Sequence, residues 1–236
     1  MKIELPSFEI LTDISPFAIL ELEEVEKAAR TCYKSEDKYE DQAASAKRLI
    51  KKLIENGHEA MLEHSTLSVK FICDRGVANE LVRHRVASFA QESTRYCNYS
   101  HDRFGRSVSF IYPVFLCDGT APFKRWMKCM KEAEKGYFEL INMGLKPEEA
   151  RDVLPLSLKT EIVITANWRE WRHILKLRTA PGAHIQMREL MCPLLKELKS
   201  RIPVVFDDIP NPECQDLYGR WKTILDNLKE EASEDE

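Results

Sequence analysis

The chain has 236 residues, 44% of them hydrophobic and 31% charged, and its formal net charge is −4. This composition is typical of a soluble globular protein, and an acidic chain is not expected to bind nucleic acid broadly. No apolar run approaches the length of a membrane span, so we expect no membrane association and a cytoplasmic location.

The hydrophobic periodicity of the N-terminal half predicts three elements. Residues 46–56 are expected to form an amphipathic helix that ends at Gly57. Ser65–Cys73 alternates apolar and polar residues, which is typical of a half-buried strand. Gly76 marks a turn, and Val77–His84 is expected to be a short helix.

The C-terminal half mixes predicted strands and helices. A weak strand is predicted at Val108–Tyr112, a long helix at Phe123–Asn142 and a central strand at Lys159–Ala166. Pro147 opens a short helix that stops by Pro155. The remaining predicted elements are helices at 168–177 and 184–199, an extended piece at Val204–Phe206 and a last helix near 214–229. The pattern predicts one α/β or α+β domain.

Seven cysteines are present, which is an odd number, and no C-x-x-C pair occurs. Their wide spacing predicts reduced thiols rather than a disulfide framework or a zinc site.

An arginine-rich segment follows the predicted short helix. Residues Arg83–Arg95, RHRVASFAQESTR, hold three arginines among small hydroxyl and amide side chains. Arginine presents a planar fork of donors that matches phosphate or carboxylate, and hydroxyls in a loop complete such an anion site. The composition fits a phosphate-bearing ligand, and it equally fits a solvated basic helix end.

The order of these residues resembles the signature of the flavin-dependent thymidylate synthases, in which R-H-R is followed after seven residues by S-x-R. Arg83–Arg85 and Ser93–Arg95 supply the two parts. The resemblance implies an α+β fold with a central, mainly antiparallel twisted sheet flanked by helices. We expect one domain over residues 1–228 and an acidic, flexible tail at 229–236.

The resemblance continues on both sides of this segment. GHEAMLEHSTL, which contains His58, is similar to the H-E-x-x-x-E-H element of the family. Asn167–Arg178, NWREWRHILKLR, is similar to its N-x-R element and the arginine that follows. His184 with Gln186 fits the histidine after that arginine, and Arg151 matches an arginine ahead of an L-P pair.

The resemblance assigns these residues to ligands. The dUMP group comprises Glu80, Arg83, Gln91, Ser93, Arg95, Arg151 and Arg178. The FAD group comprises His58, Arg83, His84, Arg85, Gln91, Asn167, Arg169, His173 and His184. Arg178 and Ser93 are assigned to the chemistry itself, and no metal is assigned. Many family members carry Gln where this chain has Glu80, and a glutamate near a phosphate is unfavourable unless it is paired.

The implied activity is the methylation of dUMP to dTMP. Methylenetetrahydrofolate would supply the one-carbon unit, and FAD reduced by NADPH would carry the electrons, without an enzyme cysteine as nucleophile. Because the cofactor performs the redox chemistry, the protein would contribute placement and electrostatics. The resemblance also implies a homotetramer.

Other interpretations of the residues stay open. Cys97 lies two residues beyond Arg95, and nearby arginines could lower its thiol pKa enough for nucleophilic catalysis. His58 and His64 suggest a metal, although zinc sites on one helix use i, i+4 spacing. Without a G-x-S-x-G elbow, a hydrolase is disfavoured. The two rival functions are a flavoenzyme acting on a different pyrimidine nucleotide and an RNA-binding module that uses the basic patches.

Overall fold

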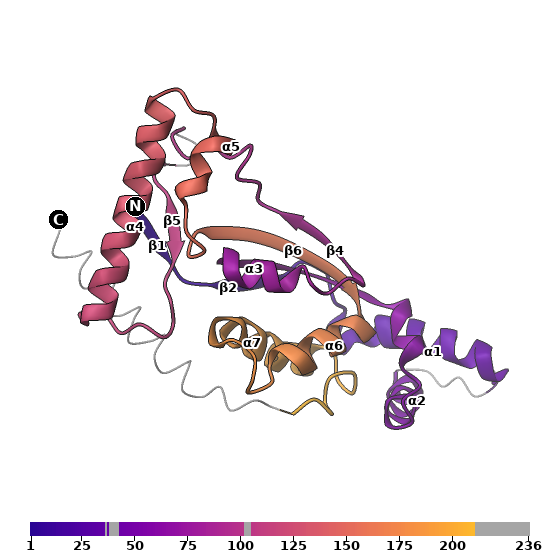
Figure 1. Ribbon diagram of the computed structural model, residues 1–236. Coiled ribbons are helices and arrows are strands. Elements are labelled where there is room, and N and C mark those ends of the chain that lie inside the picture. The colour runs from indigo at the N-terminus through magenta and orange to yellow at the C-terminus, as the bar shows by residue number, and fades with distance from the viewer. Residues whose placement is uncertain (36, 38–42, 102–104, 211–236) are drawn as a thin grey trace.

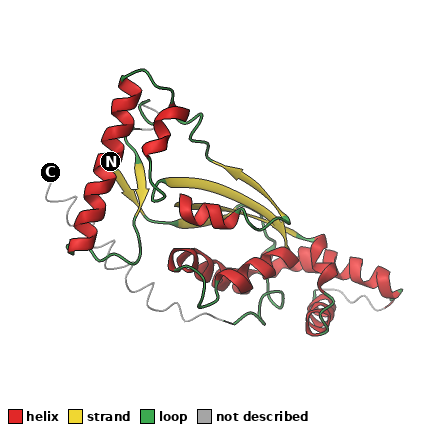
Figure 2. Ribbon diagram, in the orientation of Figure 1, coloured by secondary structure: helices red, strands yellow, loops and turns green. Residues whose placement is uncertain are grey.

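The computed structural model describes residues 1–35, 37, 43–101 and 105–210. These residues form a single α+β domain in which helices flank an antiparallel sheet, as Figure 2 shows. The fold class expected from the sequence is confirmed. The predicted helix near 214–229 and the tail at 229–236 lie outside the described residues. Within the described ranges, no helix is long and apolar enough to cross a membrane.

The central sheet has four strands in the order β2–β3–β6–β4, and every neighbouring pair is antiparallel. The strands are β2 (Ser7–Ile10), β3 (Thr66–Asp74), β4 (Ala87–Gln91) and β6 (Lys159–Asn167). β3 and β6 are the long central strands and pair along their whole length. Their continuous ladder of hydrogen bonds forms the centre of the sheet.

Each long strand presents one apolar and one polar face, because successive side chains of a strand point to opposite sides. Val69 and Phe71 on β3 and Ile162 on β6 are fully buried on one face. On the other face Lys70 and Glu161 form an ion pair at 2.5 Å. One face of the sheet therefore builds the core, and the other is polar.

Helical segments join the apolar face of the sheet in the main core (Figure 1). They are η1 (Pro16–Ala18), α1 (Ile19–Tyr33), α2 (Ala44–Glu55), η3 (Glu59–His64), α3 (Arg75–Leu81), α6 (Trp168–Arg178) and α7 (Ile185–Arg201). The buried indole of Trp171 donates its N–H to the carbonyl of Leu67 over 2.9 Å. This bond ties α6 to β3 and fixes the helix that carries most of the predicted site residues of the C-terminal half.

A smaller hydrophobic cluster lies at one end of the molecule. Its secondary structure comprises β1 (Lys2–Glu4), β5 (Ser109–Ile111), α4 (Ala121–Asn142), α5 (Pro147–Ala150) and η5 (Arg151–Val153). β1 and β5 pair in parallel, and Phe110, Met130 and Tyr137 form the buried centre. In Figure 1, α4 stands at the opposite end of the molecule from α1 and α2.

Most predicted elements agree with the structure to within a few residues. The predicted helix at 46–56 is α2, and the predicted strands Ser65–Cys73 and Lys159–Ala166 are β3 and β6. α3 begins at Arg75 rather than Val77, because the Asp74 carboxylate accepts the N–H of Val77 over 2.9 Å and caps the helix.

One predicted element is wrong, and several were missed, because no element was predicted before residue 46, where β1, β2 and α1 lie. The predicted extended piece at Val204–Phe206 is a turn, in which Val204 has a φ of 68° and Phe206 is fully buried. The edge strand β4 was missed, because its five residues ASFAQ lack the apolar and polar alternation that marks a half-buried strand.

The cysteines differ from the expectation of reduced thiols at one position. Among the described residues, five cysteines form no disulfide, namely Cys32, Cys73, Cys97, Cys117 and Cys129. Cys192 is disulfide-bonded. Sequence spacing does not report which sulfur atoms the fold brings together, so the prediction is wrong at Cys192.

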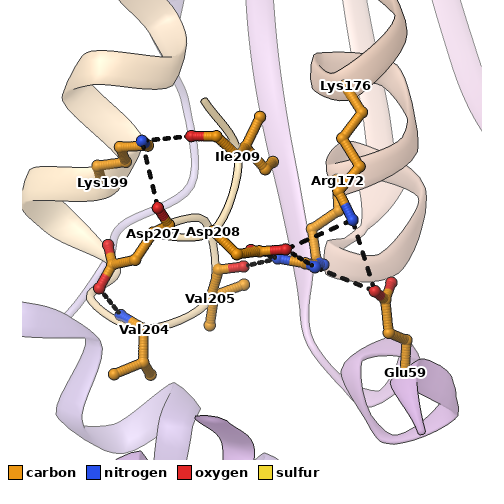
Figure 3. A network of polar contacts seen from close by, with 9 residues as sticks. All are labelled: Glu59, Arg172, Lys176, Lys199, Val204, Val205, Asp207, Asp208 and Ile209. Atoms are coloured by element: carbon orange, nitrogen blue, oxygen red, sulfur yellow. Dashed lines mark hydrogen bonds and ion pairs between the residues drawn. The ribbon is translucent and has the colours of Figure 1, made fainter. Parts of the chain in front are cut away.

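A buried arginine joins α6 to two other parts of the chain (Figure 3). The side chain of Arg172 is 1% exposed, and its two terminal nitrogens donate to the carboxylate of Asp208 over 2.6 and 2.8 Å. It also donates to Glu59 of η3 over 3.0 Å and to the carbonyl of Val205. The burial of this guanidinium is stabilised because carboxylates and a carbonyl accept from its two terminal nitrogens, whereas its buried Nε has no partner among the described residues.

Candidate functional site

Arg178, the last residue of α6, is held by α3 and the turn that follows it. Its Nη1 donates to the carboxylate of Glu80 over 2.6 Å, and its Nη2 donates to the main-chain carbonyl of Glu80 over 3.0 Å. Its Nε donates to Nε2 of His84 over 3.0 Å. The glutamate at position 80 is thus paired, which is the condition under which its charge is tolerated near an anionic ligand.

His84 is a neutral imidazole in this arrangement. The residue is 5% exposed, and burial lowers its pKa to about 4, with smaller contributions from the charges of Arg178 and His173. Because Nε2 accepts the hydrogen bond from Arg178, the ring proton resides on Nδ1. Nδ1 faces the carboxylate of Glu170 at 3.6 Å.

His84, Glu170 and His173 have the residue types of a metal site, and one potential ligand atom from each lies within 4.8 Å of the others. The rings of the two histidines meet edge to face, with centroids 5.8 Å apart. However, the guanidinium of Arg178 lies 3.0 Å from His84. A cation bound here would be repelled by that charge and would compete with the hydrogen bond to Nε2. We therefore treat the group as part of the arginine site.

A cavity of about 440 Å³ opens beside the first turn of α6. Asn167, Arg169 and His173, all predicted to bind FAD, line it. Asn167 caps α6 by accepting the N–H of Glu170 over 2.8 Å, and Arg169 forms an ion pair with Glu63 of η3 at 2.5 Å. The fold thus brings these three predicted residues together and places His173 next to His84.

A second group forms around Arg151. Nη1 of Arg151 donates to Oγ1 of Thr94 over 3.1 Å, and both residues line a cavity of about 380 Å³ together with Arg75. Arg75 is fixed through a hydrogen bond from its Nη2 to the carbonyl of Glu92, over 3.0 Å. Two guanidinium groups and a hydroxyl are donors of the kind that bind phosphate.

Ser93 and Arg95 belong to the same part of the chain. The hydroxyl of Ser93 accepts the main-chain N–H of Arg95 over 3.3 Å. The Arg95 side chain is 57% exposed and pairs with Glu148 of α5 at 3.2 Å. Among the described residues, Ser93 makes no polar contact with Arg178, so the two residues assigned to the chemistry lie in separate groups of this chain.

His184 lies immediately before α7, at a cavity of about 480 Å³ that Glu80 also lines. Gln186 in the first turn of α7 donates to the Asp74 carboxylate over 3.0 Å. Asn79 lines both this cavity and the one at Arg151. The groups around His184, Arg178 and Arg151 are therefore neighbours along α3.

Besides Arg95, three predicted residues lie at the surface and outside these cavities. Arg83 and Arg85 are exposed on either side of the buried His84, and His58 is exposed at the start of η3. None of them lines the three cavities described above.

Gln91 is separated from the Arg178 group. It lines a cavity of about 880 Å³ that includes the polar face of the sheet, and its amide donates to Thr160 over 3.3 Å. Lys159 in the same cavity contacts Glu92 at 3.4 Å and Glu161 at 2.6 Å. Because these charges neutralise one another, we assign no ligand to this cavity from its electrostatics.

Two residues with a place in these groups were missed from the sequence. Arg75 joins Arg151 and Thr94 at one cavity, and Glu170 faces His84. Glu170 lies one residue after Arg169 and three before His173, so helical spacing alone places it beside a predicted residue. No comparable signal existed for Arg75, which reaches Arg151 only through the fold.

The fold and the arginine-lined cavities define an α+β protein equipped to bind anionic ligands. Residues 21–204 match the sequence model of the family described as thymidylate synthase complementing protein. The flavin-dependent thymidylate synthase of Pyrococcus furiosus is 34% identical over 153 residues, which cover 64% of this chain and 62% of that protein. The enzyme of the same name from Corynebacterium aurimucosum is 33% identical over 200 residues, which cover 78% of each chain.

A solved structure shares the fold. The crystal structure of the UMP/dUMP methylase PolB from Streptomyces cacaoi, bound with 5-Br dUMP, has a TM-score of 0.71 and is 23% identical in sequence. The likeness covers 88% of this chain and 96% of that one. From the sequence matches, the chain belongs to the family of the flavin-dependent thymidylate synthases, as the motif around Arg83–Arg95 predicted.

Proposed function

We propose that this protein methylates dUMP to dTMP, with methylenetetrahydrofolate as the one-carbon donor and FAD reduced by NADPH. Support comes from the family and from Arg178, whose guanidinium is fixed by Glu80 and His84 at 2.6 and 3.0 Å. A guanidinium held in this way is preorganised to stabilise charge that develops on a substrate carbonyl. We also propose that the protein works in the cytoplasm.

The nucleotide site would draw on the dUMP residues assigned above. The donor set fits a nucleotide phosphate. Arg151 and Thr94 are hydrogen-bonded over 3.1 Å, and Ser93 and Arg95 flank Thr94 in the sequence. Arginines bind a phosphate in bidentate fashion, and hydroxyls complete its coordination. In this proposal Arg151 and Arg95 hold the nucleotide, while Arg178 acts at the pyrimidine.

The FAD site would draw on the residues of α6 and the surface around it. Asn167, Arg169 and His173 line one cavity, which offers an amide, a guanidinium and an imidazole to a dinucleotide. Arg83 and Arg85 are exposed and flank His84 in the sequence, so they would add positive charge beside it. Bound FAD would supply the redox chemistry, and these side chains would orient it and offset its phosphate charge.

We further propose a homotetramer whose sites combine residues of several subunits. Arg83, Arg85 and His58 are exposed, and Ser93 lies apart from Arg178. A second copy of the chain that completes the site would explain why residues assigned to one ligand face solvent on a single chain. Light scattering coupled to size-exclusion chromatography tests this: a monomer that retains full activity when diluted contradicts it.

The reaction would proceed without an enzyme nucleophile, although Cys97 forms no disulfide that would block its thiol. We expect Cys97→Ala to retain activity, because the arginine groups contain no cysteine among their contacts within the described residues. Loss of more than about a hundredfold, the scale at which a nucleophile matters, would instead assign catalysis to that thiol.

The experiment that decides the proposal follows the hydrogen at ring carbon 5. Purified protein is incubated with FAD, NADPH, methylenetetrahydrofolate and dUMP tritiated at that carbon, and the release of tritiated water and the formation of dTMP are measured. UMP and dCMP, offered in the same assay, test the rival pyrimidine nucleotides. A protein that neither binds FAD nor releases tritium does not have this function.

A further inference from the structure

Glu170 is the one described carboxylate that faces the Nδ1 side of His84, at 3.6 Å. Glu170 lies in the first turn of α6. Its main-chain N–H donates to the capping side chain of Asn167 over 2.8 Å, which fixes the first turn of the helix. Its side chain is only 12% exposed. The carboxylate is therefore held near the imidazole by the geometry of the helix itself.

The two ring nitrogens of His84 have different hydrogen-bonding roles. Nε2 receives the Nε–H of Arg178 over 3.0 Å, so that nitrogen must carry a free lone pair. In the other tautomer, an N–H on Nε2 would meet the N–H of Arg178 head on. A negative group near Nδ1 favours the tautomer with its proton on Nδ1. At 3.6 Å the contact with Glu170 is electrostatic rather than a hydrogen bond.

The tautomer of His84 affects the orientation of Arg178. Its five N–H donors include three engaged by His84 and by the carboxylate and carbonyl of Glu80. Two donors remain for a ligand, and their direction depends on how the other three are held. His84 is one of these anchors, so the orientation of Arg178 depends on the state of the imidazole.

We propose that Glu170 is a positioning residue that acts through His84 on Arg178: it selects the imidazole tautomer that accepts the Arg178 hydrogen bond. The proposal rests on the proposed function, in which Arg178 acts on dUMP. Glu170 also lines the cavity of Asn167, Arg169 and His173, so the FAD content of each variant is part of the test.

The test compares Glu170→Ala with Glu170→Gln. Alanine removes the negative group, whereas glutamine keeps an oxygen that can face the Nδ1–H. We expect Glu170→Ala to lower kcat for tritium release about tenfold, the scale of one weakened hydrogen bond to a charged group. Glu170→Gln is expected to stay within about threefold of the unaltered protein, since its amide oxygen still presents partial negative charge to the Nδ1–H. Equal loss in both variants overturns the proposal.

A coupling measurement separates positioning from a structural role. In a background of Arg178→Lys, which removes the hydrogen bond to His84, Glu170→Ala is expected to cause little further loss, because its effect passes through that bond. An additional tenfold loss would show that Glu170 acts elsewhere. The unfolding midpoint and the FAD content of each variant are measured alongside, and both are expected to remain unchanged.

Calorimetric titration with dUMP gives a readout that needs no turnover. Glu170→Ala is expected to weaken dUMP binding by about threefold, because one anchor of the arginine is loosened. Glu139→Ala, which alters a 55% exposed glutamate on α4, is the matched control and is expected to leave binding unchanged. If the unaltered protein neither binds dUMP nor releases tritium, the proposed function fails. If it does both and Glu170→Ala does so equally well, only this inference fails.

Discussion

At the scale of single residues, Glu189 on α7 is a carboxyl group enclosed by the core. It is 6% exposed, and neither of its oxygens has a hydrogen-bond partner within the described part of the chain. Burial raises its pKa to about 9, and the negative charge of Asp74 adds to the rise. At neutral pH the folded protein therefore holds this group protonated, whereas an unfolded chain ionises it near pH 4.3.

This difference makes stability depend on pH in a stated direction. Between the unfolded and folded pKa values the folded state binds the extra proton, so stability from this group falls as pH rises, by up to about 1.4 kcal/mol per pH unit. We expect the free energy of unfolding of Glu189→Gln to fall less steeply as pH rises. Urea unfolding of both proteins at pH 6, 7 and 8 measures this slope. Two curves that run parallel across that range would contradict the assignment.

Arg178 supports a prediction about activity at the same scale. Arg178→Lys keeps the positive charge but loses the planar fork that meets Glu80 and His84 at 2.6 and 3.0 Å. We expect kcat for tritium release to fall roughly a hundredfold, as when a preorganised donor is removed from a reacting oxygen. Arg201→Lys, which alters a 49% exposed arginine on α7, is the control. Equal rates for the two variants would exclude Arg178 from the chemistry.

At the scale of elements, Arg172 ties α6 to η3 and to the chain after α7 (Figure 3). Replacing it with Met leaves Glu59, Asp208 and the carbonyl of Val205 without their cation. We expect Arg172→Met to lower the free energy of unfolding by about 3 kcal/mol, as for breaking a buried ion pair. Lys176 contacts the same two carboxylates at 3.7 and 3.6 Å but is 45% exposed. Lys176→Met should cost less than about 1 kcal/mol in the same urea titration.

The elements also show where sequence reasoning succeeds. β3 was predictable because it alternates apolar and polar residues, and β6 because it holds the apolar run Ile162–Ile164. β4 was not predictable, since a short edge strand gains its structure from pairing with β6. The turn at Val204–Phe206 was mistaken for a strand because its apolar residues are buried by tertiary packing with the core, which local sequence does not encode.

The same limit applies to the candidate site. The residues of α6 came together as predicted, because helical spacing brings Arg169 and His173 to one cavity. The pairing of Glu80 with Arg178 spans 98 positions in the sequence, and no local pattern specifies it. The family resemblance named both residues without indicating that they touch.

At the scale of the whole molecule, the described residues contain two large hydrophobic clusters and a small third one at Val114 and Cys192. The main core lies between the sheet and its helices, and the smaller one lies among β5, α4 and α5. Separate clusters with few shared side chains are expected to open with different free energies.

Phe110 tests this division, because it is fully buried in the smaller cluster. Phe110→Ala is expected to remove about 3–5 kcal/mol of packing there. Amide hydrogen exchange should then quicken in α4 while β3 and β6 keep their protection. Ile162→Val in the main core is the converse variant. Equal acceleration of exchange in both regions by Phe110→Ala would mean that the domain unfolds as one unit.

The pairing of Arg178 with Glu80 has a consequence for ionic strength. A guanidinium already neutralised by a carboxylate at 2.6 Å contributes little long-range attraction to an incoming anion. The fields of exposed arginines such as Arg83 and Arg85 reach into solvent and are screened over about 8 Å at physiological salt. Added salt should therefore slow the capture of a charged nucleotide at the surface arginines and leave the placement of its pyrimidine by Arg178 nearly untouched.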